Sequence, residues 1–195
     1  MFKKVVAFLV FVLVFSVSLN AQKSVDASLA KCYGTRYHDL GNNPIVTLDV
    51  FEKFEGKLLE SGMLQDKSQE SYTMLMANVL NDDIEIPVSL WDLDEPELSM
   101  LSMPSNLQTA MLCFDDAFED NVGKLDGTSS VIAMSPFVKK LISDYNLGNK
   151  STNIRLVRAI SEEDFSKMVY KAPVLTLLHI IASYKEEMNQ LTSNY

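Results

Sequence analysis

Apolar residues recur at helical spacing along most of the chain. The clearest stretch lies near the C-terminus, where apolar positions repeat three and four residues apart from Val174 to Leu191. Other apolar residues fill the positions between them, so we expect this segment to be the central buried helix. Similar stripes predict helices over residues 47–61, 68–80, 105–118 and 136–145. Residues 152–160 fit either a strand or a helix, and we favour a helix.

Polar residues and glycines mark the ends of several of these helices. Ser61 and Gly62 provide a C-terminal stop for the first helix, and Ser68 is a suitable N-cap for the second. The pair Ser135 and Pro136 has the order expected of an N-cap followed by the first helical residue. These signals predict short loops between long helices.

The last part of the chain has a further start signal. Ser161 is followed by three acidic residues, as in the first turn of a capped helix. Pro173 then either begins the last helix or kinks a longer helix that starts at Ser161.

These elements predict an all-α domain of six to seven amphipathic helices in a compact orthogonal bundle over residues 47–195. Residues 22–46 are polar and rich in turn signals, and predict an irregular lead-in. Residues 81–104 hold three prolines and predict a long structured loop with one short helix at 95–103. Residues 54–68 align without gaps on residues 137–151, which fits either two related helical hairpins or a chance recurrence of helix-loop-helix chemistry.

The first 21 residues have the pattern of a signal peptide. Lys3 and Lys4 precede an apolar run from Val5 to Leu19, and Ala21 ends a small-residue cleavage site. The alternative is an uncleaved membrane anchor, but the run is shorter than the ~20 residues that span a bilayer. We therefore expect cleavage after Ala21 and a protein that is exported to the periplasm or beyond, without stable membrane insertion.

Charge narrows the range of partners. The chain has 17 basic and 26 acidic residues, and residues 1–21 hold two of the basic ones, so the rest carries 15 minus 26, or −11. Such a chain repels nucleic acid and anionic lipid. The segment from Asn81 to Asp126 alone carries −11. This acidic segment fits a solvated surface, a contact for a cationic partner, or a weak calcium site.

Cys32 and Cys113 are the only cysteines. In an exported chain an even number of cysteines is consistent with a disulfide. Cys113 also lies in a helical apolar pattern, where a buried thiol acts as a small hydrophobe. The sequence leaves both alternatives open.

The search for catalytic chemistry gives no motif. The chain lacks a Gly-x-Ser-x-Gly elbow, a His-Glu-x-x-His pair, a Cys-x-x-Cys pair, a complete EF-hand loop and a glycine-rich phosphate loop. The two histidines are His38, in the predicted lead-in, and His179, which we expect to be a core or boundary residue of the last helix. We therefore predict no catalytic, cofactor or metal site, and lean against an enzyme.

Parts of the chain resemble known proteins in layout. The helical pattern over residues 51–80, the region of Cys113, and the segment 161–165 before an apolar C-terminal helix are similar to those of a group of exported helical proteins of the Bacteroidota. The N-terminal segment also resembles bacterial signal peptides that end in Ala-Gln, which are common there. The resemblance implies an all-α fold and carries no established activity.

The functional hypothesis from sequence is a non-enzymatic role in protein interaction or as an accessory of the cell envelope, with another envelope or extracellular protein as the partner. Trp91 is the only tryptophan and lies among acids, so the expected contact residues are Trp91, Asp92, Asp94 and Glu95. The alternative is a small-ligand binder or a hydrolase with a pocket between helical hairpins.

Overall fold

The computed structural model describes residues 24–33, 35, 44–87, 90, 104–121, 125, 129–144 and 149–193. Within these ranges all regular secondary structure is helical, so the prediction of an all-α fold is confirmed. The predicted signal peptide, residues 1–21, lies outside the described residues. Among the helices that are described, none has the length and apolar character needed to cross a membrane.

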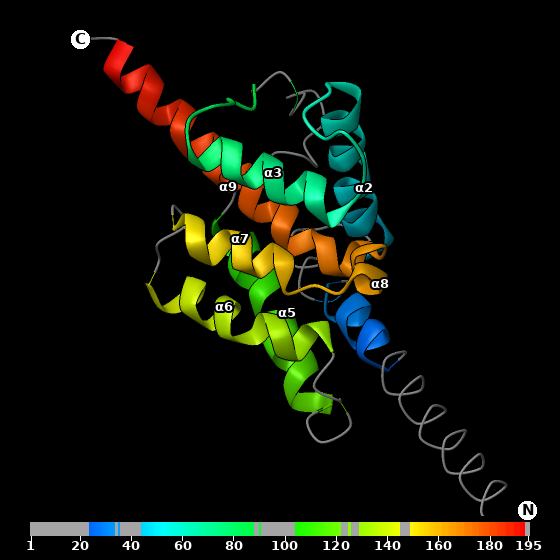
Figure 1. Ribbon diagram of the computed structural model, residues 1–195. Coiled ribbons are helices and arrows are strands. Elements are labelled where there is room, and N and C mark those ends of the chain that lie inside the picture. Colours follow the sequence, from blue (N-terminus) through cyan, green and yellow to red (C-terminus); the bar gives the residue numbers. More distant parts are fainter. Residues whose placement is uncertain are drawn as a thin grey trace, which may run out of the picture.

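Figure 1 shows the helices in their order along the chain. A first helical segment covers residues 24–33. The labelled helices are α2 (Pro44–Glu60), α3 (Gln69–Leu80), α5 (Pro104–Asn121), α6 (Ser130–Asp144), α7 (Lys150–Arg158), α8 (Glu162–Phe165) and α9 (Met168–Ser193). Residues 152–160, which fitted a strand or a helix, belong mostly to α7. In the view of Figure 1, α2 runs at a steep angle to α3.

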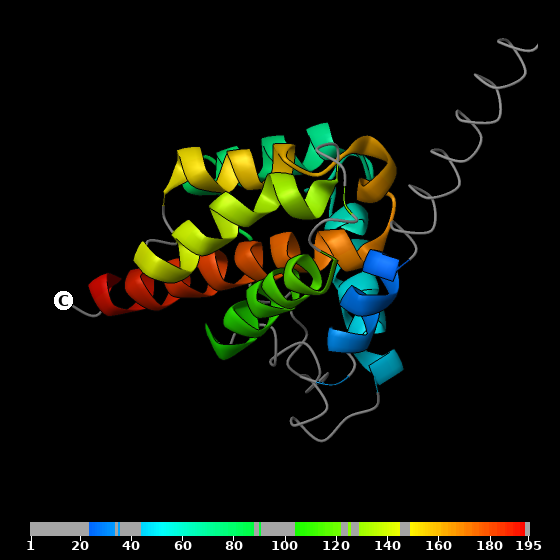
Figure 2. The same cartoon turned by 90° about the horizontal axis from the view of Figure 1, so that it is seen from below.

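Helix α9 is the centre of the fold, as its apolar sequence predicts. Every residue from Val169 to Ala182 is buried, because apolar side chains occupy all sides of this stretch. Helices α2, α3, α5 and α8 all pack directly against α9. Figure 2 shows α9 passing between α6 and α7 on one side and α5 on the other.

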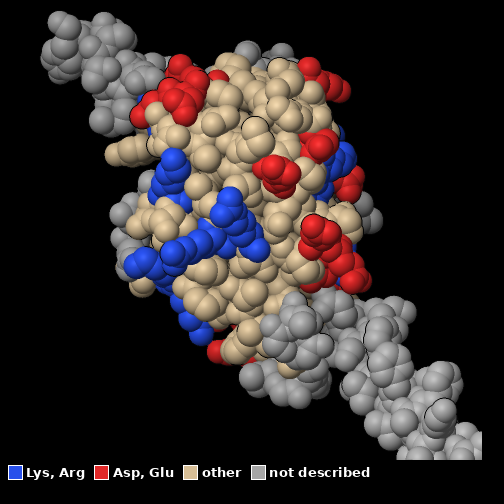
Figure 3. All heavy atoms as spheres, viewed as in Figure 1, with Lys and Arg blue, Asp and Glu red and all other residues tan. Residues whose placement is uncertain are grey.

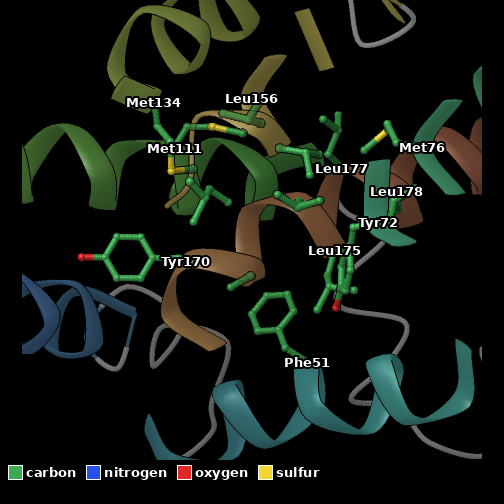
Figure 4. Close-up of a cluster of buried hydrophobic side chains, with 14 of the residues drawn as sticks. Phe51, Tyr72, Met76, Met111, Met134, Leu156, Tyr170, Leu175, Leu177 and Leu178 are labelled. Carbon is green, nitrogen blue, oxygen red and sulfur yellow. The ribbon is translucent and has the colours of Figure 1, made fainter. Parts of the chain in front are cut away.

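Side chains from several helices meet around α9 in one hydrophobic cluster. Figure 4 shows Leu175 pointing toward Phe51 of α2, and Leu177 toward the side that holds Met134 of α6 and Leu156 of α7. All five side chains are at most 1% exposed. Burying a side chain of this kind contributes roughly 1.5–3 kcal/mol relative to leaving it in water, so this cluster is the main source of stability.

The interpretation of residues 22–46 as an irregular lead-in is wrong for much of that range. Residues 24–33 form a helix, and α2 begins at Pro44 rather than near residue 47. Val25, Leu29 and Tyr33 recur four residues apart and are fully buried in the core. This stripe has only three large apolar residues, and is therefore easily missed in sequence.

A disulfide joins this N-terminal helical segment to α5. Cys32 and Cys113 are bonded, with their Cα atoms 5.5 Å apart. The bridge links positions that are 81 residues apart in the chain. The structure thus selects the disulfide from the two alternatives that the sequence left open.

Two prolines lie inside helices rather than at their starts. Helix α6 begins at Ser130, so the prediction that Ser135 and Pro136 start it is wrong. Helix α9 begins at Met168, five residues before Pro173, and no helix runs unbroken from residue 161. The sequence placed the start of α6 at its proline, and offered the same for α9 as one of two alternatives, because proline is favoured in the first turn of a helix.

Pro173 removes one backbone hydrogen bond inside α9, and a side chain of residues 24–33 replaces it. Proline has no N–H, so the carbonyl of Val169, four residues earlier, receives no bond from residue 173. The hydroxyl of Tyr33 donates a hydrogen bond to that carbonyl at 3.2 Å. A side chain from residues 24–33 thus satisfies a buried backbone acceptor in the central helix.

Two of the N-caps that the sequence indicated are present in the structure. Ser68 caps α3 by accepting from the N–H of Ser71, and Ser161 caps α8 by accepting from the N–H of Asp164. Helix α7 is capped by Asn149.

In the gap-free alignment of residues 54–68 on 137–151 the partner of Ser68 is residue 151, so the caps are out of register. Helices α6 and α7 pack directly on each other, whereas α2 and α3 do not form a comparably close pair.

Candidate functional site

Of the histidines and contact residues that the sequence singled out, only His179 lies in the part of the chain that the structure describes. His179 is 2% exposed and lies in the core, with its ring edge-on to Phe54 at a centroid distance of 5.6 Å. The Oγ of Ser183 lies 3.3 Å from His179 Nδ1. Burial lowers the pKa of His179 from 6.5 to about 4, so the ring is neutral at physiological pH. The prediction that it is a core residue agrees with its burial.

The other predicted residues fall outside the described part of the chain. These are His38 and the expected contact residues Trp91, Asp92, Asp94 and Glu95. Their role remains a prediction. Among the described residues, no group of three or more His, Cys, Asp or Glu side chains is arranged to hold a metal ion.

A buried cluster of charged residues links α2, α3 and α9. Glu55 of α2 is fully buried, and its Oε1 accepts a hydrogen bond from the hydroxyl of Tyr72 at 2.7 Å and one from Lys171 Nζ at 2.5 Å. Its Oε2 pairs with Lys67 Nζ at 2.9 Å. The side chain of Lys171 is 4% exposed, whereas that of Lys67 is 62% exposed. One carboxylate therefore orients two lysines, one inside and one at the surface.

The surroundings set the protonation of this cluster. Burial acts to raise the pKa of Glu55, but the hydrogen bonds from Lys171, Tyr72 and Lys67 outweigh it, and the pKa falls below its ordinary 4.5. Burial, together with the charge of Glu55, raises the pKa of Tyr72 well above 10. At neutral pH the cluster thus holds one carboxylate, two ammonium groups and a neutral phenol, with a net charge of about +1.

A cleft of about 740 Å³ lies beside this cluster. It is bounded by the N-terminal turn of α3, the C-terminal end of α7, α8 and the start of α9. Its charged lining residues are Lys67, Glu70, Arg158, Glu162 and Lys171, and Phe165 adds an apolar wall. Gln69 joins two sides of the cleft, because its Nε2 donates to the carbonyls of Val157 at 2.9 Å and Ile160 at 2.5 Å. The volume is in the range of small-molecule sites.

The hairpin of α6 and α7 carries a second charged feature. Lys139, Lys140, Lys150 and Arg155 are all exposed, and we call them the α6–α7 basic face. Figure 3 shows Lys and Arg side chains gathered over this part of the molecule, apart from the Asp and Glu side chains. Lys139 pairs with Asp115 of α5 at 3.4 Å, and Lys150 donates to Asn81. Residues 129–161 hold five basic residues against one acid, in a chain of net charge −9.

Sequence reasoning missed the buried cluster, although a signal was present. Position 55 lies on the same helical stripe as Phe51 and Leu58, where an apolar residue is expected. Lys171 likewise interrupts the apolar sequence of α9. A charged residue at an apolar position on each of two helices is a signal that the two residues pair in the core.

Comparison with known proteins gives no relative. No family model matches the chain, no curated protein matches it, and no solved structure matches it. The resemblance to exported helical proteins of the Bacteroidota therefore remains an expectation.

Proposed function

We propose that the protein is an exported, non-enzymatic interaction protein whose α6–α7 basic face docks onto an acidic segment of a protein partner. The observation that carries this proposal is the placement of four exposed cations on one hairpin of a strongly acidic chain. Charge that is segregated in this way steers association and selects among partners. The hairpin itself is held by buried residues such as Val138 and Leu156, so the face is a stable surface.

A protein partner suits this face better than a nucleic acid or an anionic membrane. The whole chain carries −9, and its repulsion acts on any extended polyanion over the Debye length of about 8–10 Å. A short acidic segment of a protein partner lies close to the α6–α7 basic face alone, and the acidic remainder of the chain is screened from it. The partner's contact is therefore expected to be small and rich in Asp and Glu.

The Cys32–Cys113 disulfide supports export. Disulfides persist in oxidising compartments such as the bacterial periplasm and the cell exterior, and are rare in the cytosol. The basic and apolar N-terminal pattern points the same way. The periplasm or the extracellular space is thus the proposed location.

The test is crosslinking and affinity capture from the native envelope, followed by mass spectrometry, with charge-reversal variants. We expect Lys140→Glu with Arg155→Glu to reduce recovery of a defined partner at least tenfold, and high salt to do the same, because both remove the charge attraction. The matched control is Lys31→Glu with Lys53→Glu, which makes the same change in net charge at exposed positions on other helices.

Two results would contradict the proposal. One is equal loss in both double variants, which would mean that net charge alone governs binding. The other is loss of the partner in Trp91→Ala with full retention in Lys140→Glu/Arg155→Glu, which would move the contact to the acidic segment predicted from the sequence. Circular dichroism of each variant checks that the helices are intact.

A further inference from the structure

We propose that the cleft between α3, α7 and α8 binds a small zwitterion, such as a short peptide with both ends ionised. Its carboxylate would face Lys67, Lys171 and Arg158, and its ammonium group would face Glu70 and Glu162. This site is separate from the α6–α7 basic face, and the two proposals fail or succeed independently.

The first argument concerns the buried pair beside the cleft. Glu55 and Lys171 are 0% and 3% exposed, and taking such a pair out of water costs more than hydrophobic residues of the same size would. Stability alone therefore does not explain why the core contains them. What Glu55 does achieve is to pair with two ammonium groups, on Lys171 and Lys67, next to an open volume.

The second argument concerns charge balance at the site. Glu55 neutralises only one of its two lysines, and Arg158 adds another cation on the cleft wall. A ligand carboxylate would complete the pairing of this side. Glu70 and Glu162 also line the cleft, and would repel a second anionic group but attract an ammonium group. A ligand with one negative and one positive group can therefore pair with both the cations and the carboxylates of the cleft.

The N-terminal turn of α3 adds to the carboxylate side. Ser68, Gln69 and Glu70 line the cleft at the positive end of the helix dipole. Ser68 already caps the N–H of Ser71, whereas the N–H groups of residues 69 and 70 precede the first intrahelical bond. Gln69 is anchored to the end of α7, so this turn is fixed before a ligand arrives.

The experiment is a titration of the purified, isotope-labelled protein, followed by NMR of the backbone amides. The probes are trialanine, N-acetyl-trialanine and trialanine amide, which differ only in the charge of one end. We expect saturable shifts at residues 67–73, 158 and 162–166 with trialanine, and affinity roughly tenfold weaker for each capped peptide, because each lacks one charge-assisted contact. Trialanine that gives no saturable shift at 10 mM overturns the proposal, as does equal binding of the three peptides.

Variants of the cleft residues test which side chain contacts which end of the peptide. Arg158→Gln is expected to weaken trialanine about tenfold while changing the affinity for the amide, which lacks the carboxylate, less than twofold. Glu162→Gln should show the opposite pattern, with N-acetyl-trialanine as the insensitive probe. Arg155→Gln is the matched control, since it removes the same group from the same helix outside the cleft lining. A loss with Arg155→Gln equal to that with Arg158→Gln would place binding elsewhere and overturn the assignment.

Discussion

Two clusters of similar chemistry lie near the start of α9, and their lysines, Lys167 and Lys171, are four residues apart in the chain. In one, Glu55 accepts from Tyr72 and Lys171. In the other, Asp26 accepts a hydrogen bond from the hydroxyl of Tyr170 at 2.9 Å and pairs with Lys167 at 2.9 Å. Each thus combines a carboxylate from a preceding helix with a tyrosine and a lysine. They differ in their exposure to water.

Burial decides what each cluster contributes. The side chains of Glu55 and Lys171 are 1% and 4% exposed, whereas those of Asp26 and Lys167 are 28% and 30% exposed. Lys167 also pairs with Asp164, and these hydrogen bonds outweigh burial and raise its pKa. Water can replace a lost partner only in the second cluster. The same set of groups is therefore essential at one place and nearly dispensable at the other.

The largest expected effect is the loss of the buried carboxylate. Glu55→Gln removes the charge that compensates Lys171 in the core, and should lower the free energy of unfolding by about 3–5 kcal/mol. Asp26→Asn should cost about 1 kcal/mol or less. Urea denaturation of both variants measures the difference. Similar losses at the two sites would show that burial does not separate them.

A double variant tests the physical reason for that loss. Glu55→Met with Lys171→Met leaves no unpaired buried charge, and should recover most of the stability that Glu55→Gln loses. The site in the cleft would lose its inner ammonium group at the same time. A double variant that is less stable than Glu55→Gln would mean that the pair is a net source of stability.

Loss of the disulfide should affect mainly residues 24–33, the segment that holds Asp26. Cys32→Ala with Cys113→Ala opens a loop of 81 residues, and chain entropy predicts a loss of about 4 kcal/mol. Amide hydrogen exchange should rise most over residues 24–33, because the bridge ties that segment to α5. Protection at Glu55 and Tyr72 should fall only with global stability. A rise in hydrogen exchange that is confined to α2 or α3 would contradict this prediction.

Acid should act through a third buried group, His179. Its pKa is 6.5 in the unfolded chain and about 4 in the fold. Between these values the unfolded state binds a proton that the folded state does not, so stability falls as pH drops, by about 3 kcal/mol from pH 7 to pH 4. Thermal unfolding of His179→Leu should be less sensitive over this window.

The smallest effect concerns the hydrogen bond between Tyr33 and Val169. Tyr33→Phe leaves the buried carbonyl of Val169 without this donor, and should cost about 1–2 kcal/mol. In a Pro173→Ala background the helix supplies its own N–H, so the same change should cost less. A double-mutant cycle by urea denaturation measures the coupling. An additive result would show that Pro173 does not create the need for Tyr33.

The sequence predicted the helices whose apolar stripes are long and the buried place of α9, because periodicity reports burial directly. It missed the helix over residues 24–33, whose stripe has only Val25, Leu29 and Tyr33. It also placed the start of α6 at Pro136, and offered Pro173 as a start of α9, although both helices begin five or more residues earlier. It offered a pocket between helical hairpins only as an alternative, and named none of the residues that line the cleft. The lining of the cleft comes from residues far apart in the chain, and only the packing of α3 against α7 brings Glu70 near Arg158.

The presence of only two cysteines simplifies how this chain folds under oxidising conditions. Four cysteines allow three pairings and six allow fifteen, but two allow a single intramolecular bond. Early oxidation therefore cannot trap a wrongly bridged monomer, and no step of disulfide shuffling precedes the native state. An oxidant alone, without an isomerase, should suffice for refolding in dilute solution. The remaining hazard is a bond between two chains, which grows with protein concentration.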